Sequence, residues 1–234
     1  MRPLTPRRPR GARAFLAAAI LIVALLMPGL AAARTPELFH TREQFSADLG
    51  AFTKWNKVVA RADRQARDAK SSCPGGAPAG DCVGSRWAAL VAGLAALPLR
   101  ERVAQVNALL NRVAYVSAAD NWHDADHWET PFEFLAKGGQ CEDYAIAKIM
   151  ALAASGVPEE ALRLVVLRDT SRSLDHAVAV VYVDGEALVL DNQLADVVPA
   201  ARIGWYVPYY SINRTGWWHH QSRDLWTDDL AARR

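Results

Sequence analysis

Hydrophobic residues in the first half of the chain recur at steps of three and four positions. The clearest stripe, in residues 42–69, consists of Phe45, Leu49, Phe52, Trp55 and Val59. The same spacing returns in residues 86–97 and 99–116, and such steps place apolar side chains on one face of a helix. Residues 70–84 and 117–130 have no such period. The sequence therefore predicts three amphipathic helices joined by loops.

The hydrophobic pattern changes after Gly138 and Gly139. Residues 141–155 are apolar on most sides and are followed by Gly156 and Pro158, which indicates a buried central helix. Shorter apolar runs follow at residues 162–167, 176–183, 187–190 and 205–212. The Asp184-Gly185 pair between the second and third runs is typical of a hairpin turn. We therefore predict an α+β fold in which N-terminal helices precede a central helix packed on an antiparallel sheet.

Residues 1–33 have the order of a secretory signal. Five arginines come first, an apolar run occupies residues 15–26, and Ala31-Ala32-Ala33 forms a small-residue cleavage site. The apolar run is shorter than the roughly 20 residues of a membrane-spanning helix. We expect a cleavable signal that exports the protein to the periplasm, with an uncleaved anchor as the alternative. Residues 34–234 then form a single domain.

Removal of the leader changes the charge of the protein. The whole chain has a formal charge of +2, but residues 34–234 contain 22 basic and 25 acidic residues, a net charge of −3. No basic stripe remains of the kind that nucleic-acid-binding proteins carry. We therefore expect no nucleic-acid partner.

The chain contains three cysteines, an odd number for an exported protein. Cys73 and Cys82 flank a segment rich in glycine and proline, and we predict a disulfide between them. This pairing leaves Cys141 as a reactive thiol. The alternative is that Cys141 is an inert, buried residue that packs as a small hydrophobe.

Cys141 follows a glycine pair and begins the predicted central helix. The partial positive charge at a helix N-terminus stabilises a thiolate and lowers the thiol pKa. A nucleophilic cysteine also needs a histidine partner. Of the six histidines, only His176 begins an apolar strand, which favours it over His123 and His127 in the preceding aromatic loop.

The predicted hairpin also provides a carboxylate. A two-residue turn at Asp184-Gly185 pairs Val183 with Glu186 and puts Asp191 diagonally across from His176 on the same face. A one-residue slip would reverse the faces. A carboxylate in that position orients the imidazole, as in other catalytic triads. The sequence therefore predicts the triad Cys141, His176 and Asp191.

Several segments resemble the bacterial transglutaminase-like cysteine peptidases, which include LapG-type periplasmic proteases. The longest is Trp128-Glu-Thr-Pro-Phe-Glu-Phe-Leu-Ala-Lys-Gly-Gly-Gln-Cys-Glu-Asp-Tyr-Ala-Ile-Ala-Lys148. The others are Val106-Asn107 with Asn111, Asp120 with Trp122, Asp175-His-Ala-Val178 and Leu188-Val-Leu-Asp-Asn192. The resemblance covers residues 100–215 and implies a papain-like, transglutaminase-type fold with the same three catalytic residues. It also implies an endopeptidase that cuts the N-terminal region of a large surface adhesin between two alanines and so controls biofilm release. The implied inhibitor is an inner-membrane receptor for cyclic di-GMP.

The same resemblance implies a calcium site beside the nucleophile. The family has an aspartate directly before the cysteine, where this chain has Gln140, and it shares Glu142 and Asp143. The amide oxygen of Gln140 is an acceptable calcium ligand, so we expect these three residues to bind calcium. The alternative is that the two acids only complement the helix dipole.

Two other functions remain open for this scaffold. A thioester intermediate can react with an amine as well as with water, which would make the protein an acyl transferase or amidase. A non-catalytic binding module is the third possibility, but the presence of Cys141, His176 and Asp191 together favours an enzyme.

Overall fold

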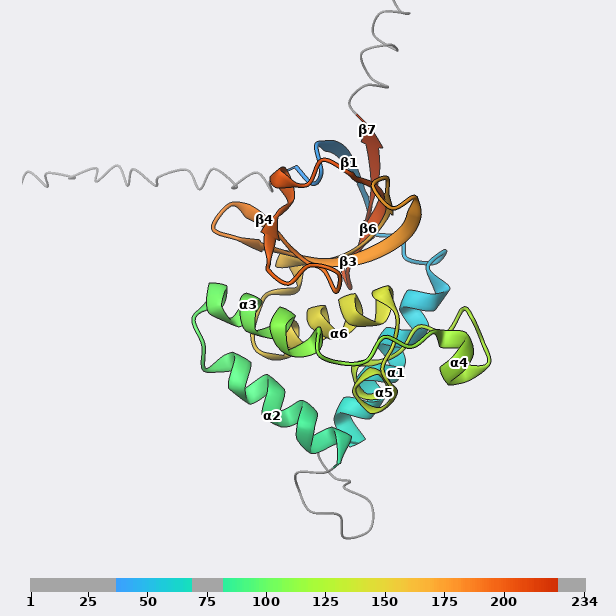
Figure 1. Cartoon of the computed structure of the whole chain (residues 1–234), viewed down its shortest axis with the longest axis vertical. Helices are drawn as coiled ribbons and strands as arrows, with labels where there is room; N and C mark the ends of the chain where they lie inside the picture. The colour runs from blue at the N-terminus through green and yellow to red at the C-terminus, as the bar shows by residue number, and fades with distance from the viewer. Residues whose placement is uncertain (1–36, 69–81, 223–234) are drawn as a thin grey trace, which may run out of the picture. The chain divides into compact units, whose positions relative to one another are not determined.

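The computed structural model describes residues 37–68 and 82–222 (Figure 1). The helices are α1 (Thr53–Asp68), α2 (Val83–Ala95), α3 (Leu99–Leu110), α4 (Ala118–Trp122), α5 (Pro131–Lys137) and α6 (Cys141–Ala154). The strands are β1 (Thr41–Ser46), β2 (Leu162–Asp169), β3 (Leu174–Val183), β4 (Glu186–Leu190), β5 (Val198–Pro199), β6 (Tyr206–Ile212) and β7 (Trp217–Ser222). Short 3-10 helices, η2 (Glu159–Ala161) and η3 (Ala200–Arg202), precede β2 and follow β5.

Two predictions concern segments outside the described residues. The predicted signal at residues 1–33 lies there, as does Cys73, so the signal and the Cys73–Cys82 disulfide stay predictions. Within residues 37–68 and 82–222, no helix is long and apolar enough to cross a membrane.

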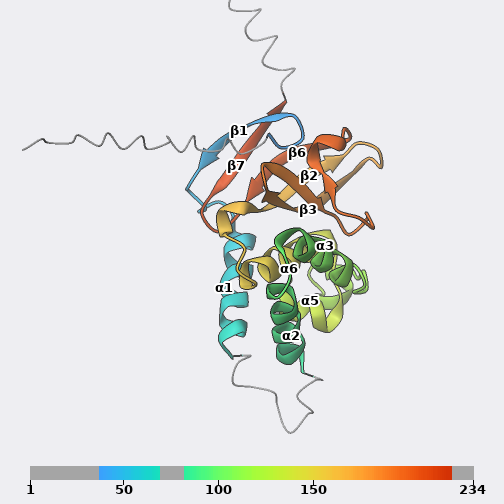
Figure 2. The same ribbon diagram turned by 90° about the vertical axis from the view of Figure 1, so that its left-hand side faces the viewer.

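The described strands form one antiparallel sheet in the order β1-β7-β6-β2-β3-β4-β5. The sheet is strongly curved, and the helices lie on its outer side (Figures 1 and 2). Helices packed on an antiparallel sheet confirm the predicted α+β class.

Each face of the sheet has its own apolar core. Leu164, Ala179 and Ile212 face the helices and pack in one cluster with α6. Residues 143–152 of α6 are all buried, which confirms the prediction of a central, buried helix. On the other face, Val165 and Val178 belong to a second cluster that also contains Leu38 and Phe39.

The prediction for the N-terminal segment was wrong in part. Residues 41–46 are strand β1 rather than the start of a helix, because they pair with residues 217–222 of β7. Phe45 packs on Trp218 of that partner strand, with ring centroids 5.1 Å apart, instead of facing a helical core. The third helix ends at Leu110, six residues earlier than predicted, and α4 lies within the predicted loop.

The predicted hairpin is confirmed. Val183 pairs with Glu186, and the register runs to Ala179 and Leu190. Asp184 and Gly185 have φ values of 51° and 79°, the left-handed backbone of a tight hairpin turn. Pairing with β4 ends at Ala179, whereas β3 begins five residues earlier, so the first part of β3 extends past the end of β4.

Candidate active site

The start of α6 depends on the glycine pair. Gly138 has a φ of +85°, and a Cβ there would lie 2.5 Å from the carbonyl oxygen of Ala114. A Cβ on Gly139 would lie 2.8 Å from the Cβ of Asp143. The Gly139 N–H donates to Ala114 O at 3.2 Å, and the Val116 N–H donates to Gly139 O at 3.0 Å. This close backbone approach ends directly before Cys141, the first residue of the helix.

Asp143 ties the first turn of α6 to two backbone segments. Its Oδ2 accepts the Gln140 N–H at 2.9 Å, and its Oδ1 accepts the Glu129 N–H at 2.7 Å. The side chain is fully buried. Burial, with the nearby charge of Glu142, raises the pKa of the Asp143 carboxyl to about 8.

The Cys141 thiol points to its neighbour in the chain. Its Sγ donates to Glu142 Oε2 at 3.3 Å. Burial, the charge of Glu142 and this hydrogen bond raise the thiol pKa to about 12, against the opposing effect of the Ala177 and Glu142 backbone amides. The predicted lowering of this pKa by the helix N-terminus is therefore outweighed. The Ala177 amide places the sulfur beside β3, one residue from His176.

His176 and Asp191 form a buried pair. The imidazole Nε2 lies 2.9 Å from Asp191 Oδ1, and the two side chains are 1% and 0% exposed. Asp175, on the opposite face of β3, instead contacts Arg168 and Tyr209. The hairpin register thus brings His176 and Asp191 together on one face, where the sequence predicted them.

Within residues 37–68 and 82–222, the Asp191 carboxylate has three hydrogen-bond donors. Oδ1 accepts the Gln193 N–H at 2.8 Å as well as the contact from His176, and Oδ2 accepts the Tyr206 hydroxyl. Burial raises the pKa of Asp191, but the hydrogen bonds and the positive charge of a protonated His176 outweigh it and hold the pKa below its usual value. Asp191 is therefore an anion at neutral pH.

The thiol and the imidazole are close in the fold but are not hydrogen-bonded. His176 Nδ1 is buried and has no hydrogen-bond partner among the described residues. The nitrogen that is not used by Asp191 is therefore free to receive a proton. The thiol must turn away from Glu142 to donate to it.

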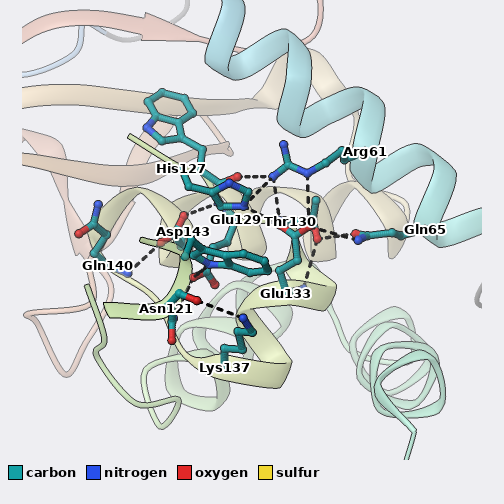
Figure 3. A network of polar contacts seen from close by, with 12 residues as sticks. Arg61, Gln65, Asn121, His127, Glu129, Thr130, Glu133, Lys137, Gln140 and Asp143 are labelled. Carbon is teal, nitrogen blue, oxygen red and sulfur yellow. Dashed lines mark hydrogen bonds and ion pairs between the residues drawn. The ribbon is translucent and has the colours of Figure 1, made fainter. Parts of the chain in front are cut away.

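Figure 3 shows a polar network that joins α1 to the start of α6. Arg61 of α1 pairs with Glu133 of α5 at 3.0 Å, and Gln65 contacts Thr130 at the N-cap of α5. His127 Nε2 lies 3.3 Å from Glu133, so this alternative to His176 is engaged in the network. His123, the other alternative, is the C-cap residue of α4, with a left-handed backbone.

Two buried residues near Asp191 were not predicted as site residues. Tyr206 comes from β6, and no local sequence signal links it to the hairpin. Lys148 of α6 is fully buried, with its Nζ 3.5 Å from Leu190 O. Burial lowers the pKa of Lys148 to about 7, although the Asp191 charge opposes this. The sequence did contain a signal for Lys148, because a lysine within a mostly apolar helix is unusual.

The three residues predicted to bind calcium make other hydrogen bonds in the structure, so calcium binding by them stays a prediction. Both carboxylate oxygens of Asp143 accept backbone N–H groups, and Gln140 Nε2 donates to Glu142 Oε1 at 2.6 Å. Calcium takes six to eight oxygen ligands. In the described part of the chain, no three His, Cys, Asp or Glu side chains converge to hold a metal ion.

Known proteins are similar to this chain in sequence and fold. The model of the bacterial transglutaminase-like cysteine proteinases (BTLCP) matches residues 80–224. EGTA-treated LapG of Legionella pneumophila is 28% identical, with a TM-score of 0.57 over 69% of this chain and 87% of that chain. Calcium-bound LapG of the same organism is 26% identical, with a TM-score of 0.55 over 72% of this chain and 98% of that chain. No curated protein matches. The chain therefore belongs to the bacterial transglutaminase-like cysteine proteinases and is a cysteine peptidase.

Proposed function

We propose that the protein is a periplasmic endopeptidase with Cys141 as nucleophile, His176 as general acid and base, and Asp191 as the residue that orients the imidazole. The observation that carries this proposal is the buried His176–Asp191 pair, 2.9 Å apart, beside the first residue of α6. His176 Nδ1, which has no hydrogen-bond partner in the described part of the chain, is the proton acceptor that a cysteine nucleophile needs.

The reaction proceeds in two stages. The thiol leaves Glu142 and gives its proton to His176 Nδ1, and Sγ attacks the scissile carbonyl carbon. The backbone N–H of Cys141, in the first turn of α6, has no helical acceptor and stabilises the oxyanion. His176 then donates the proton to the leaving amine, which leaves an acyl thioester on Cys141. Water, activated by His176, hydrolyses this thioester and restores the thiol.

The proposed substrate is the N-terminal region of a large surface adhesin, cut between two alanines, so that cleavage controls release from a biofilm. The proposed inhibitor is an inner-membrane receptor for cyclic di-GMP. Membership of the family and likeness to LapG over 87–98% of that protein's length support this assignment.

The test is cleavage of an adhesin N-terminal fragment that carries a di-alanine site, followed by mass spectrometry of the products. We expect cleavage between the alanines by the parent protein. Cys141→Ala and His176→Ala should abolish it while circular dichroism shows that both proteins stay folded, and Asp191→Asn should leave a trace. A folded, fully active His176→Ala protein would sink the assignment. A new amide formed when glycinamide is added, in place of the hydrolysis product, would identify an acyl transferase.

Calcium binding is proposed to be weaker in this chain than in LapG, which has been solved in a calcium-bound form. A cation between Gln140 and Glu142 would have to break their 2.6 Å hydrogen bond, and Gln140 brings no charge. We predict that Gln140→Asp increases calcium affinity because it adds a carboxylate to the ligand set. Isothermal calorimetry with calcium alone measures this effect, with Gln105→Asp at an exposed position of α3 as control. Equal affinity of the parent and Gln140→Asp proteins would contradict it.

A further inference from the structure

Tyr206 reaches the carboxylate of Asp191 from a different part of the sheet. It is the first residue of β6, and 4% of its surface is exposed. Its hydroxyl donates to Asp191 Oδ2, whereas His176 and the Gln193 N–H contact Oδ1. Among the described residues, the Tyr206 hydroxyl is the donor that holds Oδ2. Without it, the carboxylate is held on one oxygen alone and is less restricted about its Cβ–Cγ bond.

The ring of Tyr206 lies edge-on between two other rings. Its centroid is 6.0 Å from that of His176, at 62°, and 5.6 Å from that of Phe39, at 71°. Phe39 and Tyr206 belong to the apolar cluster on the inner face of the sheet. The ring therefore packs against the imidazole of His176, in a site where His176, Asp191 and Tyr206 are all buried. A hydrogen bond shielded from water in this way is electrostatically stronger than an exposed one.

The Tyr206 hydroxyl remains a donor over the working pH range. Burial raises the pKa of the phenol far above its usual value, and the hydrogen bond to the Asp191 carboxylate raises it further. The hydroxyl therefore keeps its proton whenever Asp191 is ionised.

We propose that Tyr206 is a positioning residue for the peptidase reaction. Its hydroxyl holds Asp191 so that Oδ1 faces His176 Nε2, which leaves His176 Nδ1 for the thiol. The inference rests on the proposed roles of Cys141, His176 and Asp191. It adds a fourth residue that acts through Asp191 without touching the substrate.

The decisive variant is Tyr206→Phe, which keeps the ring packed against His176 and Phe39 and removes only the hydroxyl. A hydrogen bond to a charged group is worth about 1.5–3 kcal/mol, so we expect kcat to fall roughly 10- to 100-fold. KM should stay unchanged. The acidic limb of the pH profile of kcat/KM should move to higher pH, because Asp191 loses a donor that favours its anion. The control is Tyr209→Phe, whose hydroxyl bonds the exposed Asp175 on the other face.

The outcomes separate this inference from the proposed function. If Tyr206→Phe keeps the kinetics and pH profile of the parent protein while Asp191→Asn retains only a trace of activity, the role of Tyr206 is overturned and the role of Asp191 stands. If Tyr206→Phe is partly unfolded at the assay temperature, kcat is measured again at a lower temperature where the variant is fully folded. Recovery of the parent kcat there would show that Tyr206 only stabilises the fold, which would also overturn its positioning role. Full activity of Asp191→Asn would overturn both assignments. An equal loss in Tyr209→Phe would show that the effect is not specific to the Asp191 contact.

Discussion

At the scale of single residues, burial raises the pKa of the Cys141 thiol most, and Glu142 raises it further. The Glu142 carboxylate accepts the Cys141 S–H, and its charge disfavours the thiolate that the proposed mechanism requires. The helix N-terminus alone would favour that thiolate. In the structure the proposed nucleophile therefore keeps its proton, and displacing or neutralising Glu142 would remove one of the two main causes.

We predict that Glu142→Gln makes Cys141 more reactive towards iodoacetamide. The substitution removes a negative charge beside the sulfur, so the thiol pKa should fall from about 12. Below that pKa, each unit of decrease raises the thiolate fraction about tenfold. Alkylation rates measured from pH 6 to 10 by mass spectrometry test this, with Glu160→Gln at an exposed position as control. An unchanged or slower rate in Glu142→Gln would refute the role given to this carboxylate.

A second prediction concerns Lys148, which is fully buried and makes one weak hydrogen bond, to Leu190 O, among the residues that the structure describes. Below pH 7 its ammonium is charged in both the folded and unfolded states, so the cost of burying that charge is present in full. Between pH 7 and 10.5 the folded state loses the proton first, and stability rises with pH. Lys148→Met removes this cost and should increase the free energy of unfolding at pH 6 by about 1–4 kcal/mol.

Urea denaturation of both proteins at pH 6, 8 and 10 measures the Lys148 effect. The stability difference should shrink as the pH rises. Lys57→Met, at an exposed position on α1, should change stability little at any pH. A Lys148→Met protein that is less stable than the parent at pH 6 would mean that the ammonium, through the Asp191 charge, stabilises the fold.

At the scale of elements, the close packing around the start of α6 fixes where Cys141 lies. The segment before the helix runs against residues 114–116, and Asp143 packs over Gly139. A side chain at Gly139 would meet Asp143 at 2.8 Å and Phe134 at 2.9 Å. Both neighbours are fully buried, so a shift of either one would disturb the packing around it.

We therefore predict that Gly139→Ala lowers the free energy of unfolding by about 1–3 kcal/mol, the usual cost of overpacking. Because the added methyl group displaces Asp143, peptidase activity should fall as well. Gly204→Ala is the matched control, since a Cβ there would meet nothing within 4 Å. Chemical denaturation of the two variants checks the difference, and equal stabilities would show that the first turn of α6 adjusts freely.

Some of these elements were predictable from local sequence and others were not. The Asp184-Gly185 turn determines the β3–β4 register within a few residues, so the placement of Asp191 beside His176 followed from local geometry. Thr130 and Glu133 form a capping box at the start of α5, a readable signal for a helix that was not predicted. Strand β1 was not predictable in this way, because its partner β7 lies more than 170 residues away.

The same distinction explains the site residues that were missed. The contact between Tyr206 and Asp191 depends on how β6 and the end of β4 meet across the curved sheet. The raised pKa of Cys141 depends on burial and on the Glu142 rotamer. Neither is encoded in residue spacing, whereas the helix start after two glycines is.

At the scale of the whole molecule, α1 is linked to the active-site region through charged groups at two places. Arg61 contacts Glu133, His127 and the Trp128 carbonyl, and these groups adjoin Glu129, whose N–H holds Asp143 (Figure 3). The second place is an ion pair between Asp63, also on α1, and Arg214, which follows the end of β6. The two ion pairs differ in burial: the side chains are 27% and 14% exposed in the first and 43% and 36% exposed in the second.

This difference in burial leads to the last prediction. Arg61→Met removes the positive charge that pairs with the largely buried Glu133 carboxylate. We therefore expect the free energy of unfolding to fall by about 1–3 kcal/mol. Arg214→Met breaks a solvent-screened pair and should cost less than about 1 kcal/mol. Arg61 also helps hold the pKa of Glu133 below its usual value against burial. The stability that Arg61 contributes through Glu133 is therefore present above pH 4.5 and lost as the pH falls, so the two variants should become more alike at pH 3–4. Urea denaturation at pH 3.5 and 7 measures both effects. If Arg61→Met and Arg214→Met are equally stable at pH 7, the network in Figure 3 does not stabilise the packing of α1 against the segment before α6.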